Sequence, residues 1–329
     1  MRYVIGVDLG GTNIVVGTVA EDGSTILGVR ADATKPEEGA EAVVGRIARL
    51  AKESIAEAEQ VGGVRAERVA GVGIGSPGPL DRKTGVVLVT PNLGWKNFPL
   101  RARVSDALGL PATLDNDANC AVFGEWWVGA GRGSRHLVGI TIGTGIGGGI
   151  VIDGQLYHGA SDAAGEIGHT TIDSTGRRCK CGNYGCIEAY ASGPNIAARA
   201  VEGIEAGAET RLADYVGGDL ARITAQTVYE AAHDGDDYAR EVVRDTAKFL
   251  GAGIANLINI FNPDTFVILG GVTLAGDRLF TPLRAEVTRR AFRPAVEACR
   301  IVPGELPGTA GVFGAAATFK AQTWGGSGA

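Results

Sequence analysis

The sequence predicts an α/β protein in which one fold is repeated in two lobes, and three observations lead to this prediction. The chain of 329 residues is long enough for two domains that each bury a core. Short apolar runs typical of buried strands alternate with longer runs of helical period. Residues 138–145 repeat the pattern of residues 5–12, and each segment is followed by a second strand-like run. A duplicated α/β domain is the simplest interpretation.

The predicted first lobe begins with a strand, a hairpin and a helix. We expect strands at residues 3–9, 14–20, 25–31 and 69–74. Gly-rich and Asp-Gly turns separate the first three, and the turn Ser76-Pro77-Gly78-Pro79 closes the fourth. Between residues 39 and 60, apolar residues recur at the spacing of one helix face, with Arg, Lys and Glu between them.

We place the lobe boundary after residue 116. The N-terminal lobe then covers residues 1–116 and the larger C-terminal lobe covers residues 117–308, while a helix at about 309–322 could return to the first lobe. In the second lobe we expect helices at 118–128, 195–201, 237–261 and 277–291, and a strand at 265–269. The tail from Gly325 to Ala329 is expected to be disordered.

Composition excludes some classes of partner. Lys and Arg total 31 and Asp and Glu total 37, which gives a net charge of −6 without a long basic run. Nucleic acid and anionic membranes both require clustered positive charge, so we expect neither. Met1 leads directly into a strand-like segment without a signal core, and the uncharged residues 137–152 are glycine-rich and shorter than the roughly 20 residues that span a bilayer. We therefore expect a cytoplasmic protein.

The first glycine-rich turn has the character of a phosphate loop. Gly10 and Gly11 let backbone N–H groups turn toward an anion, while Thr12 adds a hydroxyl donor and Asn13 begins the next strand. Asp8, at the end of the first strand, is placed to hold Mg²⁺ through water. An ordinary glycine hairpin is the alternative, since short glycine motifs are common.

Two further glycine blocks match this loop. The block at residues 143–149, with Thr144 and Gly145, supplies a second phosphate loop in the second lobe. Gly270 and Gly271 follow a buried strand and suit close approach of an adenosine to backbone, although a lone Gly-Gly is more often a plain strand-to-helix turn. Together the three blocks predict nucleotide binding, because their structural contexts agree.

A run of polar residues stands where a strand is expected to end and a helix to begin. The helix N-terminus favours the ionised form of Asp117, which can accept the proton of a sugar hydroxyl as that hydroxyl attacks the γ-phosphate. Asn116 offers an amide that donates to and accepts from hydroxyls. The alternative is that Asp115 or Asp117 merely caps the helix.

The most specific constellation is a Cys₃His set. Its members are His169, Cys179, Cys181 and Cys186. These ligands fill a tetrahedral Zn²⁺ shell with no open position, so the predicted zinc is structural. It would join the loop holding Glu166 to the loop holding Glu188, so that both carboxylates can meet one ligand. Unmetallated thiols are the alternative, since Cys-x-Cys is less usual than Cys-x-x-Cys.

These residues resemble the ROK family (repressors, open reading frames and kinases) of the actin-like ATPase superfamily. The resemblance covers nearly the whole chain and rests on motifs in the family's order: DLGGTN, DNDAN, IGTGIGGG, EIGH, CKCGNYGC and ILGG. Within the family the chain looks most like bacterial glucokinases, and residues 90–95 contribute to that impression.

The resemblance implies a two-lobed fold that closes over a hexose and MgATP, with Asp117 as the base for phosphorylation of the 6-hydroxyl, most simply that of glucose. It implies that sugar hydroxyls are bound by Asn116, Asp117, Glu166, His169 and Glu188. His169 would serve zinc and sugar together, and Asn92 and Gly78 are further candidates on the sugar side. Family members commonly form dimers or tetramers, so a homo-oligomer is expected.

Two alternatives remain at this point. The family includes sugar-sensing transcription regulators, which carry a helix-turn-helix domain ahead of the phosphate loop, whereas here the loop begins at Asp8 and the charge is acidic. The second alternative is a kinase for fructose, mannose or an N-acetylhexosamine, or one that uses polyphosphate as donor.

Overall fold

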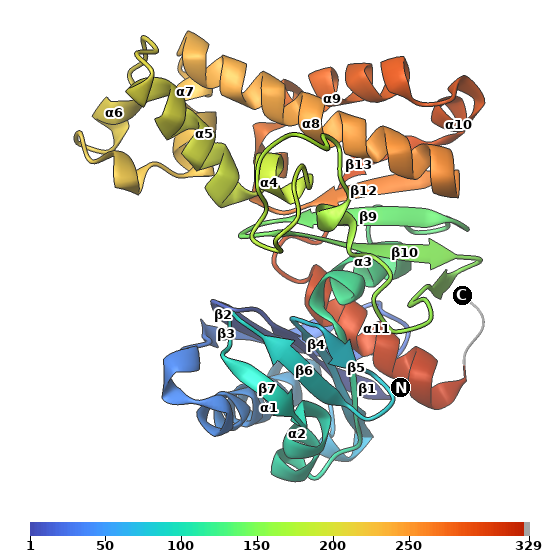
Figure 1. Ribbon diagram of the computed structural model, residues 1–329. Coiled ribbons are helices and arrows are strands. Elements are labelled where there is room, and N and C mark those ends of the chain that lie inside the picture. Colours follow the sequence, from blue (N-terminus) through green and yellow to red (C-terminus); the bar gives the residue numbers. More distant parts are fainter. Residues whose placement is uncertain (326–329) are drawn as a thin grey trace. The chain divides into compact units, whose positions relative to one another are not determined.

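The computed structural model describes residues 1–325 and has the mixed α/β architecture that was predicted. Residues 326–329 of the predicted disordered tail lie outside the described residues. The chain forms two compact units (Figure 1). Unit 1 comprises residues 1–137, 149–165 and the segment from Glu305 onward, and unit 2 comprises residues 138–148 and 166–304.

Unit 1 is built on a five-stranded sheet in the order β3-β2-β1-β4-β8. Its strands are β1 (Tyr3–Leu9), β2 (Asn13–Ala20), β3 (Ile26–Ala33), β4 (Val69–Ser76) and β8 (Ala112–Asn116). The first three are antiparallel, whereas β4 runs parallel to β1 and β8 runs parallel to β4. The predicted opening hairpin and fourth strand are confirmed.

A small second sheet in unit 1 was not predicted. It has the order β5-β6-β7 and consists of β5 (Leu80–Asp81), β6 (Val86–Thr90) and β7 (Trp95–Phe98). These strands are short, and β6 and β7 carry exposed residues between buried ones, so the apolar pattern is weak.

Helices cover both faces of the large sheet in unit 1. They are α1 (Ala40–Gly62), α2 (Leu100–Leu108), α3 (Asp117–Val128) and α11 (Ala310–Trp324). Strand β1 divides its side chains between the faces with the period of two that strands impose. Ile5 and Val7 belong to the cluster that contains α1, while Val4 packs with Val312 and Phe319 of α11.

Glycines allow α11 to lie directly on the sheet. A Cβ on Gly6 would stand 2.0 Å from the carbonyl oxygen of Val312, and one on Gly73 would stand 1.8 Å from that of Ala315. Both distances are far shorter than real contacts, so no side chain fits at these positions. The C-terminal helix is therefore an integral layer of unit 1.

Unit 2 combines sheet strands with a set of helices. The second five-stranded sheet has the order β11-β10-β9-β12-β13, with β9 (Leu137–Ile142), β10 (Ile146–Ile152), β11 (Gln155–Leu156), β12 (Thr265–Leu269) and β13 (Arg300–Pro303). Of these, β11 and residues 149–152 of β10 are grouped with unit 1. The helices are α4 (Glu188–Ala191), α5 (Gly193–Glu205), α6 (Leu212–Tyr215), α7 (Ala225–His233), α8 (Asp237–Phe261), α9 (Asp277–Arg290) and α10 (Arg293–Ala298). The prediction of a long helix at 237–261 is confirmed, whereas α4, α6, α7 and α10 were not predicted.

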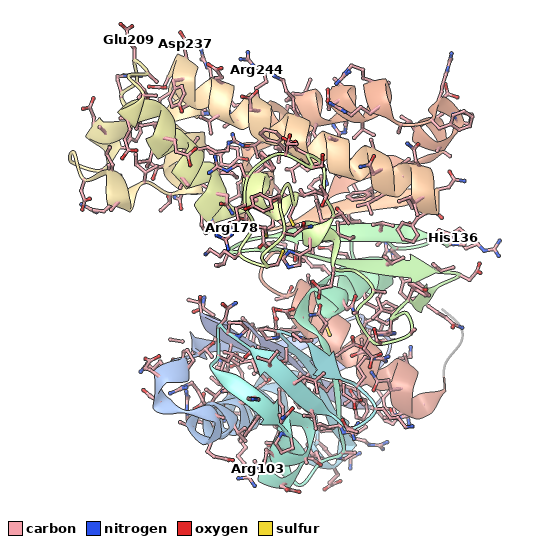
Figure 2. The ribbon with its side chains drawn as sticks, in the orientation of Figure 1. Arg103, His136, Arg178, Glu209, Asp237 and Arg244 are labelled. Carbon is pink, nitrogen blue, oxygen red and sulfur yellow. The ribbon has the colours of Figure 1, made fainter. Side chains whose placement is uncertain are left out.

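Charged side chains extend outward from each unit, as Arg103 of α2 and Asp237 of α8 show in Figure 2. Among the described residues, none of the helices combines the length and the apolar character needed to cross a membrane. The lobe boundary expected after residue 116 differs from the compact units, which group 117–137 and 149–165 with the N-terminal strands. That lobe boundary stays a prediction, and α11 lies in unit 1.

Candidate active site

Strand register brings polar residues to one edge of the unit 1 sheet. Asp8 of β1 stands opposite Gly75 of β4, and Gly75 stands opposite Asp115 of β8. Strand β8 ends one residue later, at Asn116. The carboxyl ends of parallel strands meet at the same edge, which is where ligands bind in open α/β sheets. The predicted phosphate loop and the predicted base therefore belong to one region of unit 1.

The first glycine loop is a tight turn with its polar tip exposed. The backbone N–H of Gly10 donates to the carbonyl of Asn13 at 2.9 Å, and the Thr34 hydroxyl donates to the carbonyl of Gly10 at 2.7 Å. Thr12 and Asn13 are exposed. A Cβ on Gly11 would lie 3.2 Å from the Cβ of Asn92, so Asn92 borders the loop. The structure thus adds Asn92 to the surroundings of the phosphate loop.

Asp8 lies in an environment that opposes its negative charge. Burial, and then the neighbouring carboxylate of Asp117, raise the pKa of Asp8 to about 7. Gly311 at the start of α11 leaves room for this carboxylate, because a Cβ there would lie 2.3 Å from Asp8 Oδ2. A pair of close carboxylates of this kind is stabilised by a proton or by a bound cation.

Asn116 caps helix α3, which neither Asp115 nor Asp117 does. Its Oδ1 accepts a hydrogen bond from the backbone N–H of Asn119 at 3.1 Å. Asp117 is the first residue of the helix, and its Oδ1 accepts from the N–H of Ala118 at 2.8 Å. The capping function, which was the alternative for the two aspartates, is therefore carried by Asn116, and the partial positive charge of the helix N-terminus favours the ionised form of Asp117.

The side chain of Asp115 lies in a different environment from that of Asp117. Its side chain is fully buried, and its Oδ2 accepts from Arg82 Nε at 2.9 Å. His158 Nε2 lies 2.9 Å from the same oxygen. Neither partner carried a motif in the sequence.

The second glycine loop, in unit 2, is joined to Glu188. Glu188 Oε2 accepts a hydrogen bond from the backbone N–H of Ile146 at 2.8 Å. The backbone N–H of Gly193, the first residue of α5, donates to the carbonyl of Gly143 at 2.9 Å. The loop is thus held by the starts of two helices, α4 and α5.

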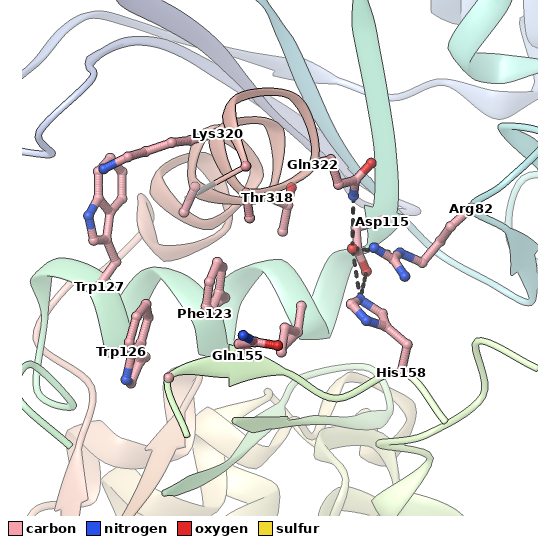
Figure 3. Close-up of a pocket in the computed structure, with 15 residues that line it drawn as sticks. Arg82, Asp115, Phe123, Trp126, Trp127, Gln155, His158, Thr318, Lys320 and Gln322 are labelled. Atoms are coloured by element: carbon pink, nitrogen blue, oxygen red, sulfur yellow. Dashed lines mark hydrogen bonds and ion pairs between the residues drawn. The ribbon is translucent and has the colours of Figure 1, made fainter. Parts of the chain in front are cut away.

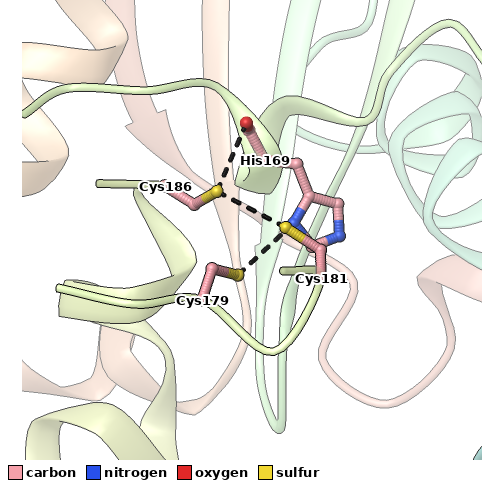
Figure 4. Close-up of side chains that lie close together, drawn as sticks. All are labelled: His169, Cys179, Cys181 and Cys186. Carbon is pink, nitrogen blue, oxygen red and sulfur yellow. Dashed lines mark hydrogen bonds between the residues drawn. The ribbon is translucent and has the colours of Figure 1, made fainter. Parts of the chain in front are cut away.

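The Cys₃His set forms a compact cluster in unit 2 (Figure 4). The candidate ligand atoms of His169, Cys179, Cys181 and Cys186 all lie within 4.8 Å of one another. The Sγ atoms of Cys181 and Cys186 are 3.7 Å apart, and Cys179 Sγ lies 3.8 Å from His169 Nδ1. Around a tetrahedral zinc with Zn–S bonds of about 2.3 Å, two sulfurs lie roughly 3.8 Å apart. The donor set therefore fits a zinc ion in both chemistry and size.

Two predicted sugar-binding residues, Glu166 and Glu188, lie beside this cluster, and a third, His169, belongs to it. Glu166 Oε2 lies 3.9 Å from His169 Nε2, and the Glu166 side chain is 58% exposed. Glu188 Oε1 lies 3.9 Å from Cys179 Sγ. Burial, and then hydrogen bonds with the neighbouring thiols of Cys181 and Cys179, raise the pKa of Cys186 to about 12. Carboxylates and thiols are thus crowded into one small region, which a divalent cation would stabilise.

A cavity of about 960 Å³ opens beside the second glycine loop within unit 2. Thr144 and Gly271 are among its lining residues. Gly270, which directly precedes Gly271, has a φ of 105° and could not carry a side chain, since a Cβ would lie 2.0 Å from the carbonyl oxygen of Ile142. The buried hydroxyl of Tyr229, also a lining residue, has no hydrogen-bond partner among the described residues. The cavity has the size of a cofactor or nucleotide site.

Comparisons with known proteins agree with this geometry. Residues 4–322 match the ROK family. The chain belongs to the ROK family. It is 39% identical to a glucokinase from Thermotoga maritima, over 98% of each chain. A crystal structure of a ROK family glucokinase from Streptomyces griseus in complex with glucose and AMPPNP is 37% identical, with a TM-score of 0.81, and the match covers 96% of this chain and 98% of that one.

Repressors are also similar to this chain. A putative xylose repressor from a Caldicellulosiruptor species is 35% identical over 95% of this chain and 77% of its own length. The predicted duplicated actin-like α/β fold is confirmed by the similarity to ROK glucokinase and hexokinase structures.

Some of the residues that line the unit 2 cavity were not identified as candidates from the sequence. They include Tyr215, Tyr229, His233 and Arg278. They lie on or beside α6, α7 and α9, and are separated in sequence from every glycine motif. The capping box at Thr224 and Thr227, which starts α7, is a local signal that would have located that helix.

Proposed function

We propose that this ROK-family chain is a glucokinase that transfers the γ-phosphoryl group of ATP to the 6-hydroxyl of glucose. One observation carries the proposal: over nearly its full length the chain is similar to a glucokinase whose structure holds glucose together with AMPPNP, an ATP analogue. The glucokinases from Thermotoga maritima and Streptomyces coelicolor, at 39% and 35% identity, support the same activity.

In this proposal Asp117 is the general base. Its carboxylate takes the proton of the sugar hydroxyl as that oxygen attacks phosphorus, which is the function of a catalytic aspartate in phosphoryl transfer. The N-terminus of α3 supports the position, because it favours the ionised carboxylate that a base requires. The carboxylate of Asp8 is close enough to Asp117 for the two charges to interact, so the protonation of one affects the other.

The nucleotide is assigned to the glycine loops and to the unit 2 cavity. Backbone N–H groups around Gly10, Gly11 and Thr12, and around Thr144 and Gly145, are suited to phosphate oxygens. The adenosine is assigned to the cavity of about 960 Å³, beside Gly270 and Gly271. Asp8 would hold Mg²⁺, which neutralises charge on the phosphates.

The sugar is assigned to the residues that the family resemblance implies. They are Asn92, Asn116, Asp117, Glu166, His169 and Glu188. Glu188 is supported by the hydrogen bond that the backbone N–H of Ile146 donates to its Oε2, and its Oε1, 3.9 Å from Cys179 Sγ, is the oxygen that we assign to a sugar hydroxyl. We assign a structural zinc to His169, Cys179, Cys181 and Cys186, since four protein ligands fill its shell. A cytoplasmic location and a homo-oligomer remain expectations from the family resemblance.

A coupled ADP-release assay tests the proposal. Glucose, mannose, fructose and N-acetylhexosamines would be compared as acceptors, and ATP and polyphosphate as donors. We expect the highest kcat/KM with glucose and ATP, because each wrong epimer leaves a polar group of the site unpaired. Higher kcat/KM for another hexose, or for polyphosphate, would replace the glucose or the ATP assignment.

The repressor relative supports a second candidate, a sugar-responsive regulator. The observation in its favour is 35% identity to a putative xylose repressor over 95% of this chain. A gel-shift assay with promoter fragments from sugar operons separates the two functions. Specific DNA binding that a sugar abolishes, together with absence of kinase activity, would favour the regulator.

A further inference from the structure

The fully buried carboxylate of Asp115 is the centre of a polar network within unit 1 (Figure 3). Its Oδ2 accepts from Arg82 Nε at 2.9 Å, and His158 Nε2 lies 2.9 Å from Oδ2 and 3.2 Å from Oδ1. Gln322 Nε2 of α11 lies 3.5 Å from Oδ2. An ionised carboxylate only accepts hydrogen bonds, so these groups are the donors and the imidazole carries a proton on Nε2. None of the four side chains has a part in the function proposed above.

Asp115 is not available to a substrate. Besides the contacts of Arg82 and His158, its Oδ1 accepts from the backbone N–H of Asn116 at 2.9 Å, and Asn119 Nδ2 lies 3.5 Å away. These donors occupy the lone pairs of both oxygens, and the side chain is closed to solvent. A buried carboxylate is costly unless it is paired in this way, so the contacts of Asp115 are strongly determined.

Arg82 joins Asp115 to a second carboxylate, that of Asp162. Arg82 Nη1 lies 3.4 Å from Asp162 Oδ1, and the backbone N–H of Arg82 donates to Asp162 Oδ2 at 3.2 Å. The side chains of Arg82 and Asp162 are only 22% and 24% exposed, so this is not a loose surface pair. The planar fork of a guanidinium can hold two carboxylates at once, which the single ammonium of a lysine cannot do in the same geometry.

Two members of the network belong to one closed loop, residues 158–164, which we call the anchor loop. The backbone N–H of Ala164 donates to the carbonyl of His158 at 3.1 Å, so the two ends of the loop lie together. Asp162 has a φ of 58°, a left-handed conformation that a residue other than glycine keeps only where its surroundings hold it. The anchor loop is thus fixed to β8 through Asp115 and to the segment after β5 through Arg82.

The network adjoins the residues to which sugar binding and proton transfer are assigned. Asp115 is followed at once by Asn116 and Asp117. A Cβ on Gly78, four residues before Arg82, would lie 3.6 Å from Asn116 Nδ2, so the segment that leads to Arg82 borders Asn116. A general base must stand within hydrogen-bond reach of the proton that it accepts, and a displacement of about 1 Å can cost roughly 10²-fold in rate.

We propose that Asp115, Arg82 and His158 are positioning residues, which hold the segment of Asn116 and Asp117 in the orientation that catalysis requires. All three act through this segment, because the carboxylate at the centre of the network is closed to substrate. The proposal rests on the proposed kinase function, in which Asp117 is the base. A network that served stability alone would affect unfolding and leave the kinetics of the folded protein unchanged.

Two variants of His158 test the proposal. His158→Leu removes the donor and leaves Asp115 paired with Arg82, whereas His158→Gln keeps an N–H that can reach the carboxylate. We expect His158→Leu to lower kcat/KM for glucose about ten-fold, the scale of one hydrogen bond to a charged group. The KM of ATP should stay unchanged, because the nucleotide is assigned to other residues. His158→Gln should recover most of the lost kcat/KM.

A second variant and a control accompany these. Arg82→Lys keeps the positive charge but cannot bridge Asp115 and Asp162, so it should also lower kcat/KM for glucose, and it serves if His158→Leu does not fold. Thr18→Val is the control, because it removes another buried hydrogen bond of unit 1, the one of 2.9 Å between Thr18 Oγ1 and Ser54 Oγ. It should lower Tm and leave the glucose kinetics unchanged.

Hydrogen exchange measures the anchoring without an activity assay. Peptides that cover residues 115–119 and 158–164 should exchange faster in His158→Leu than in the unaltered chain, and Thr18→Val should not affect them. Unchanged exchange in both segments would overturn the network as an anchor. Faster exchange with unchanged glucose kinetics, or an equal kinetic loss in Thr18→Val, would overturn the positioning role.

Failure of the proposed function would give a different result. If another hexose proves to be the acceptor, the same variants are compared with that hexose, and the same outcomes decide. If the unaltered chain phosphorylates no sugar, the kinase proposal fails and takes the positioning role with it, while hydrogen exchange still shows whether His158 and Arg82 hold the segment after Asp115.

Discussion

Glu188 and Ile146 are joined by a hydrogen bond of 2.8 Å from the backbone N–H of Ile146 to Glu188 Oε2. Ile146 begins β10 within the second glycine block, residues 143–149, while Glu188 begins α4 two residues after the cluster cysteine Cys186. The bond therefore joins the proposed phosphate loop to the proposed zinc cluster within unit 2. A substitution that displaces the phosphate loop should therefore also alter the zinc cluster, and a substitution in the cluster should alter the loop.

Gly145→Ala is expected to disturb this bond. A Cβ at Gly145 would lie 2.6 Å from Glu188 Oε2, so the carboxylate must move away from its place. We expect kcat/KM for glucose to fall roughly ten-fold, the effect of losing one charge-assisted hydrogen bond. Steady-state kinetics would measure it. The control is Gly45→Ala on α1, where nothing lies within 4 Å of the new Cβ; equal kinetics in the two variants would contradict the predicted effect.

Asp117→Asn is expected to abolish most of the turnover. The amide cannot accept the hydroxyl proton, so kcat should fall by about 10²-fold or more, with a modest change in sugar affinity. Kinetics and equilibrium binding of glucose would separate the two effects. Asp106→Asn, at an exposed position of α2, is the matched control. Near-normal turnover of Asp117→Asn would exclude Asp117 as the base.

Cys181→Ser is expected to release the metal. Cys181 is exposed, so the substitution leaves no cavity, and the expected loss of stability comes from the missing ligand. Metal analysis should find zinc in the unaltered chain and little in the variant, whose Tm should fall and respond less to chelators. Cys299→Ser, outside the cluster, should retain the metal. Freshly purified unaltered protein without zinc would contradict the assignment.

The raised pKa of Asp8 predicts that the free energy of unfolding depends on pH. Its pKa is raised from 3.8 to about 7 in the folded chain, by burial and then by Asp117. A carboxyl group with a raised pKa stabilises the folded state at low pH, and this contribution is lost as pH rises from about 4 through about 7. A change of this size corresponds to roughly 4 kcal/mol at most, at about 1.36 kcal/mol per pH unit. Because Asp8 keeps some exposed surface, we expect less than this.

Urea unfolding at pH 5 and pH 7.5, without Mg²⁺ or nucleotide, would measure this dependence. Asp8→Asn removes the titrating group, so its free energy of unfolding should change less between the two pH values than that of the unaltered chain. Identical pH profiles of the two proteins would show that Asp8 has an ordinary pKa.

The parts of the fold that the sequence predicted have strong periodic signals. Strand β1 is a continuous apolar run, and α8 repeats its apolar residues over 25 residues, so each pattern has few alternatives. The β5-β6-β7 sheet was missed because β5 has only two residues and the signal is short. Whether such short segments form strands depends on their pairing with distant residues, and the local sequence pattern does not reveal it.

The candidate site was likewise predictable only where its residues form a local motif. The glycine loops, Asp117 and the Cys₃His set are local motifs, so they were recognisable as candidates. Three residues able to cap a helix stand together at Asp115, Asn116 and Asp117, and only backbone geometry selects Asn116. His158 and Arg82 lie 43 and 33 residues from Asp115 in sequence, and no spacing rule relates them.

The contact of α11 with the unit 1 sheet has a consequence for biosynthesis. Domains usually fold during translation from the N-terminus onward. Here the helix that covers Val4 and Val19 is the last one in the described chain, so this face of the sheet stays open while the preceding residues are being made. Nascent chains are therefore expected to expose apolar strand surface until α11 has been made, and a truncation within α11 should yield a protein that chaperones retain.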